Sequence, residues 1–84
     1  MSQTSKLLGR ILGGRADANI GFNDLVGLLL ELQFQERIKG SHHIFSRSGI
    51  VEILNLQAEG SKAKPYQVRQ VRQLILKYRL GEDL

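Results

Sequence analysis

The segment Gly40-Ser41-His42-His43-Ile44-Phe45 holds both histidines of this 84-residue chain and lies between two stretches with strand-like composition. Histidine is the side chain whose ordinary pKa, about 6.5, allows proton transfer near neutral pH. Arg37, Lys39 and Arg47 flank the segment and add positive charge. This combination of residue types predicts acid–base chemistry on an anionic substrate.

The two histidines are neighbours in a predicted strand, where successive side chains point to opposite faces of the sheet. His42 and Ile44 should therefore share one face, and His43 and Phe45 the other. We expect one histidine to meet a ligand and the other to be structural. A strand histidine that is hydrogen-bonded to the backbone is the alternative to a functional role for His43. A metal site is not expected, because two separated histidines in a chain without cysteine do not supply three or four converging ligands.

The charge balance favours a polyanionic partner. Twelve Lys and Arg oppose eight Asp and Glu, which gives a net charge of +4 and a pI near 9.9. Such a balance is typical of proteins that bind nucleic acid, although a solvated basic surface is the alternative. The apolar run over residues 25–30 is far shorter than the roughly 20 residues that span a bilayer. We therefore expect a cytoplasmic protein of one domain with no membrane contact.

Hydrophobic periodicity predicts an α+β fold. Residues 7–12 have the apolar face of a short helix, which either docks or frays, and a linker follows to Gly21. The remaining expected elements are a helix over 23–33, strands over 34–39, 42–47 and 50–57, a loop over 59–64, and a helix that begins at Pro65. This order, α-β-β-β-α after a short N-terminal helix, predicts a three-stranded antiparallel sheet with two main helices on one face.

From Phe22 to Leu80 the chain resembles the HicA family, the mRNA interferase toxins of type II toxin–antitoxin systems. The resemblance rests on Leu32-Gln33-Phe34 after an amphipathic helix, on the histidine segment, and on Val71-Arg72-Gln73-Leu74-Ile75-Leu76 in the last helix. The chain differs from the family at Gln33, where Gly is frequent, and at Leu54-Asn55-Leu56-Gln57, where many members carry a Pro and a further His. On this basis residues 1–21 form an N-terminal extension with a short helix and linker, and residues 22–84 form the HicA-like domain.

The resemblance implies a fold similar to the double-stranded-RNA-binding domain, and metal-independent cleavage of single-stranded RNA without a cofactor. It assigns the general base to His43, which would take the proton from a ribose 2′-OH as that oxygen attacks the adjacent phosphorus. His42 would assist or be structural. The residues expected to hold the RNA and its phosphates are Arg37, Lys39, Gly40, Ser41 and Arg47.

The resemblance also implies mRNA as the substrate and a HicB-like antitoxin protein as the partner that keeps the nuclease inactive. Val26 and Leu30 widen the apolar stripe of the helix over 23–33 beyond what one small sheet needs. This surplus indicates contact with the N-terminal helix or with a protein partner. Two other functions stay open: a non-catalytic RNA-binding module on the same fold, and an inactive interaction protein.

Overall fold

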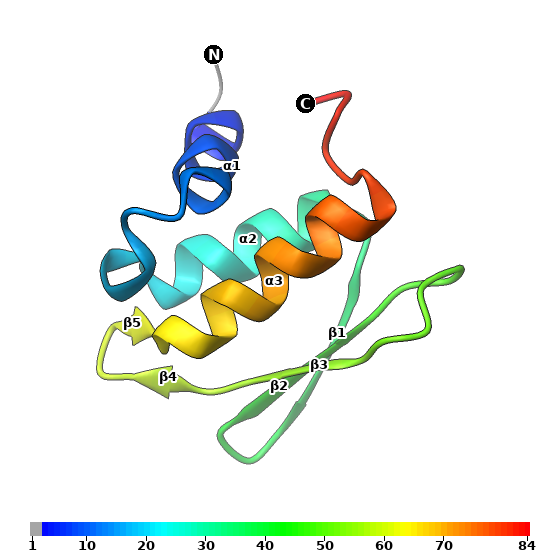
Figure 1. The fold of residues 1–84 in the computed structure, drawn as a ribbon. Helices are drawn as coiled ribbons and strands as arrows, with labels where there is room; N and C mark the ends of the chain where they lie inside the picture. The colour runs from blue at the N-terminus through cyan, green and yellow to red at the C-terminus, as the bar shows by residue number, and fades with distance from the viewer. Residues whose placement is uncertain (1–2) are drawn as a thin grey trace.

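The computed structural model describes residues 3–84, and Figure 1 shows the path of the chain. The elements follow in the order α1 (Gln3–Gly13), η1 (Asp17–Asn19), α2 (Phe22–Glu31), β1 (Gln35–Lys39), β2 (His42–Ser46), β3 (Leu54–Leu56), β4 (Ala58–Glu59), β5 (Lys62–Ala63) and α3 (Pro65–Tyr78). The predicted α+β class is confirmed, as is an antiparallel sheet with strand order β1-β2-β3. Helices α2 and α3 lie side by side on one face of that sheet (Figure 1).

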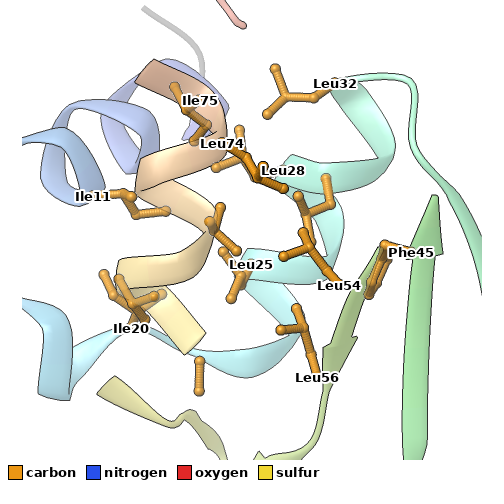
Figure 2. Close-up of a cluster of buried hydrophobic side chains, with 14 of the residues drawn as sticks. Ile11, Ile20, Leu25, Leu28, Leu32, Phe45, Leu54, Leu56, Leu74 and Ile75 are labelled. Atoms are coloured by element: carbon orange, nitrogen blue, oxygen red, sulfur yellow. The ribbon is translucent and has the colours of Figure 1, made fainter. Parts of the chain in front are cut away.

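The core forms where the helices meet this face of the sheet. Phe45, Leu54 and Leu56 alternate with exposed or half-buried residues along β2 and β3, and their buried side chains face those of Leu25 and Leu28 on α2 (Figure 2). The alternation follows from the two-residue period of a strand, and the helical residues recur at three- and four-residue spacing. Burial of these side chains fixes which face of each strand is turned away from the helices.

The N-terminal segment contributes to the same core. Leu7, Leu8, Ile11 and Ile20 are buried, and α1 packs against α2 and α3 on the side away from the sheet (Figure 1). The Arg72 guanidinium on α3 donates hydrogen bonds to both carboxylate oxygens of Asp17, at 2.8 and 3.1 Å, and to the carbonyl oxygen of Ile11 at 3.1 Å. The segment is therefore docked on the helices rather than frayed.

Two regions of the chain differ from the expectation. The third strand begins at Leu54 rather than at residue 50, because the Glu52 carboxylate accepts hydrogen bonds from Lys77 Nζ and Tyr78 Oη and holds the preceding segment against the end of α3. Where a loop was expected over 59–64, the structure has the β4–β5 hairpin over residues 58–63, whose turn uses Gly60 at a φ of +61°. Lys62 also bridges to Gly21, which ties this hairpin to the start of α2.

The connection from α2 to β1 passes through an unusual backbone conformation. Gln33 has a φ of +72°, in the left-handed region that glycine adopts without the steric conflict of a Cβ atom. This conformation reverses the chain so that Phe34 N–H reaches the carbonyl oxygen of Leu29 at 3.0 Å and the Phe34 side chain enters the core. Within residues 3–84, no helix has the length and apolar character needed to cross a membrane.

Candidate functional site

The β1–β2 hairpin fixes the direction of both histidines. Gly40, at a φ of +61°, allows the tight turn with Ser41, and the register then pairs Lys39 with His42 and Ile38 with His43. Residues directly opposite each other in an antiparallel pair project from the same face. The expected separation of the histidines is therefore confirmed: His43 lies on the face that the helices cover, and His42 lies on the outer face.

His43 is half-buried and forms a dyad with a carboxylate. Its Nδ1 atom lies 2.7 Å from Glu36 Oε2, and its ring packs edge-on against the Phe22 ring, with centroids 4.9 Å apart. Because a carboxylate accepts the hydrogen bond, Nδ1 carries the proton and the lone pair of the neutral ring is on Nε2. The partner of His43 is thus a side chain and not the backbone group that the structural alternative supposed.

His42 is exposed on the outer face. Its Nδ1 atom lies 2.9 Å from Asn55 Oδ1 on β3. An amide oxygen can only accept, so Nδ1 donates and the lone pair of the neutral ring is again on Nε2. Lys39 is the cross-strand neighbour of His42, and Arg37 follows on the same face of β1. This face therefore brings an imidazole with a defined tautomer together with two cations.

The residues expected to bind phosphate divide between separate places. Arg37 and Lys39 project from the face opposite to His43, so they accompany His42 only. Arg47 follows the far end of β2, about 16 Å from His42 at roughly 3.3 Å per residue. Ser41 lies in the turn, where its Oγ atom accepts a hydrogen bond from Gln57 Nε2 at 2.8 Å.

A groove with a volume of about 670 Å³ runs beside this site, between β3 and α3. His42 and Asn55 line its sheet side, and Gln70, Gln73 and Lys77 line its helix side. Hydrogen bonds from Lys77 and Tyr78 hold the pKa of the Glu52 carboxyl at about 2. The Glu52 side chain, which lines the groove, is therefore ionised at neutral pH. The volume is within the range of small-molecule sites.

Three parts of this arrangement escaped the sequence analysis: the Glu36 partner, the Asn55 partner and the groove. Glu36 did leave a signal, because it interrupts the apolar alternation between Phe34 and Ile38. A carboxylate on the apolar face of a strand needs a partner there. Asn55 left no comparable signal, since an exposed amide in a strand is ordinary.

Among residues 3–84, no group of three or more His, Cys, Asp or Glu side chains converges on a possible metal position. Comparisons of the chain with protein-family models, curated proteins and solved structures found no match. The functional argument therefore rests on the geometry of the two histidine sites and on the charges beside them.

Proposed function

We propose that this protein is an endoribonuclease of the toxin type that cleaves single-stranded RNA, mRNA above all, at the outer face of its sheet. The observation that carries the proposal is His42, an exposed imidazole that Asn55 orients and that lies across from Lys39. A phosphate held by Lys39 would place the adjacent ribose beside the lone pair on Nε2. The resemblance of residues 22–80 to the HicA toxins supports the same activity.

The proposed reaction uses only protein side chains. His42 Nε2 takes the proton from a ribose 2′-OH, the 2′-oxygen attacks the adjacent phosphorus, and the bond from phosphorus to the 5′-oxygen breaks. The leaving 5′-oxygen takes a proton from water or from the imidazolium. Lys39 and Arg37 stabilise the negative charge that develops on the phosphorane oxygens. The products are a 2′,3′-cyclic phosphate and a 5′-hydroxyl.

The assignment of the general base to His43, which the HicA resemblance implies, stays a prediction alongside the proposal for His42. The geometry favours His42, because the cations and the groove accompany His42 while His43 packs against Phe22. In our proposal the Glu36–His43 pair supports the hairpin from the helix side. The two assignments differ in which single substitution abolishes cleavage.

The test is induced expression in bacteria and RNA cleavage in vitro with three forms: the unaltered chain, His42→Ala and His43→Ala. We expect His42→Ala to lose cleavage by at least 100-fold and to relieve growth arrest, while its circular dichroism stays native. Cleavage by the unaltered chain should survive EDTA and leave cyclic phosphate ends. Full cleavage by His42→Ala would refute the role of His42, and loss in a folded His43→Ala alone would restore His43 as the base.

A non-catalytic RNA-binding module is the second candidate, because the basic outer face would bind phosphate whether or not cleavage follows. Tight binding of RNA that still carries its 2′-hydroxyls, without cleavage, would favour it.

As a toxin the protein would act in the cytoplasm and need an inhibitor. A HicB-like antitoxin that covers the outer face and the exposed Leu30 is the partner we propose.

A further inference from the structure

Helix α3 presents a polar stripe to the groove, and most of its side chains are uncharged. Tyr66, Gln70, Gln73 and Lys77 are spaced at i, i+4, i+7 and i+11, so they lie on one side of the helix, and all four line the groove. Three of these positions carry a phenol ring or an amide, and the fourth, Lys77, is ion-paired with Glu52. The stripe is suited to a ligand with hydrogen-bonding groups rather than to one with charge alone.

The strand side of the groove offers backbone groups as well. In the amide orientation that satisfies both of its polar atoms, Gln67 donates to the carbonyl oxygen of Gln57 at 3.1 Å and accepts from its N–H at 3.0 Å. The backbone groups of Gln57 therefore point away from β2. Because this direction alternates along a strand, the N–H and C=O of Asn55 point the same way, along the free edge of β3 and into the groove.

A nucleobase has the chemistry that this lining would recognise. It has flat apolar faces that stack on aromatic rings, and an edge of donors and acceptors that pairs with amide groups. Tyr66 is about half exposed, at 49% for the whole residue, and Leu54 and Leu74 add apolar lining. His42 lies at the rim, so a base in the groove would belong to a nucleotide next to the phosphate on the outer face.

We propose that the groove between β3 and α3 binds one base of single-stranded RNA and sets the base preference at the cleavage site. The proposal rests on the proposed function, because it takes the RNA at His42 as given. Tyr66 stacks on the base, Gln70 and Gln73 read its edge, and the β3 backbone at Asn55 supplies further hydrogen bonds.

The first experiment measures affinity without cleavage. A short 2′-O-methyl oligoribonucleotide has no attacking hydroxyl, so its binding to the full chain can be followed by fluorescence anisotropy. We expect Tyr66→Leu to weaken binding roughly tenfold, because one stacked base is lost, and Tyr66→Phe to stay within about twofold. Gln3→Ala is the matched surface control, because Gln3 is an exposed residue of α1, on the other side of the helices.

The second experiment measures specificity. The bases flanking the cleaved bonds are mapped on a mixed RNA for the unaltered chain and for the Gln70→Ala/Gln73→Ala double variant. We expect the double variant to lose base preference while the salt dependence of its binding stays unchanged, because amides read bases and cations hold phosphates. An unchanged preference would overturn the assignment of these two residues.

Two outcomes would overturn the whole inference. One is a folded Tyr66→Leu variant that binds and cleaves RNA like the unaltered chain. The proposed nuclease activity would then hold, but the groove would have no part in binding the base. The other is a set of NMR shifts at Asn55 and Gln73 with a capped Thr-Val hexapeptide and none with RNA, since the free edge of β3 would then accept a strand instead. Binding that depends on Tyr66 in a chain without nuclease activity would refute the proposed function and keep the pocket.

Discussion

At the scale of residues, two adjacent histidines have acquired different surroundings. Each donates from Nδ1 to a side-chain oxygen, but His42 pairs with a neutral amide on the exposed face and His43 pairs with a carboxylate in a half-buried position. A single step along a strand reverses the face, so sequence adjacency here means spatial separation. The function of each ring then depends on what shares its face.

The two orienting partners give a direct test of which ring acts on RNA. Asn55→Leu removes the acceptor from His42, and we expect cleavage to fall roughly tenfold or more, because the ring loses its tautomer and direction. Asn55→Asp keeps an acceptor and should retain most of the activity. Glu36→Leu is the matched change at His43, because it also removes the acceptor, and it should cost far less cleavage than Asn55→Leu. Rates should be measured across pH 5 to 8; a larger loss with Glu36→Leu would point to His43.

Glu52 predicts how stability depends on pH in acid. Its pKa is about 2 in the folded chain against an ordinary 4.5, because Lys77 and Tyr78 donate hydrogen bonds to the carboxylate. A lowered folded-state pKa stabilises the protein above pH 4.5, and this contribution disappears as the pH falls toward 2. We expect Glu52→Gln to flatten the dependence of urea unfolding on pH between 5 and 2. Lys77→Met should flatten it in the same direction, and an unchanged slope in both would contradict the assignment.

At the scale of elements, the turn between α2 and β1 carries a conformational cost. Gln33 adopts a φ of +72°, while glycine occupies this region without a Cβ conflict. Gln33→Gly should therefore stabilise the chain by up to about 1 kcal/mol, after the greater chain entropy of glycine is subtracted. The midpoint of urea unfolding measures this gain. Gln35→Gly, in β1, is the matched control and should destabilise; a loss with Gln33→Gly would mean that the amide of Gln33 outweighs the strain.

Different elements position different parts of the candidate site. The β1–β2 register sets the faces of the histidines, β3 supplies Asn55, and α3 supplies the far wall of the groove. Helix α1 packs on the other side of α2 and α3. Its buried apolar side chains complete the core that holds these elements in place. Residues 3–20 thus serve the site through packing rather than through contact.

At the scale of the whole molecule, the net charge of +4 predicts how RNA binding responds to salt. Phosphate contacts release counterions, so the affinity for single strands should fall with salt at a slope of about 0.7 per phosphate held. Lys39→Gln should lower this slope by about one such unit, because Lys39 lies on the outer face beside His42. Lys6→Gln, on α1, removes the same charge away from the sheet and should leave the slope unchanged. Equal effects of both changes would show that only net charge matters.

The sequence by itself determined the features that depend on local backbone geometry. The two-residue period placed His42 and His43 on opposite faces, the Gly40-Ser41 turn joined β1 to β2, and Pro65 marked the start of α3. These features need only the chain's own periodicity and turn chemistry, because side-chain direction repeats with the backbone. The α+β class and the three-stranded antiparallel sheet followed from the same local information, but the β4–β5 hairpin did not.

The tertiary structure alone decided which groups meet. The Asn55 acceptor of His42 and the Arg72–Asp17 pair join residues 13 and 55 positions apart, and the groove joins β3 to a helix that lies beyond the β4–β5 hairpin. Strand register and core packing bring these residues together, and neither can be predicted from the periodicity of a single segment. The β1–β2 register likewise placed Arg37 and Lys39 on the face opposite to His43, because residues paired across antiparallel strands share a face.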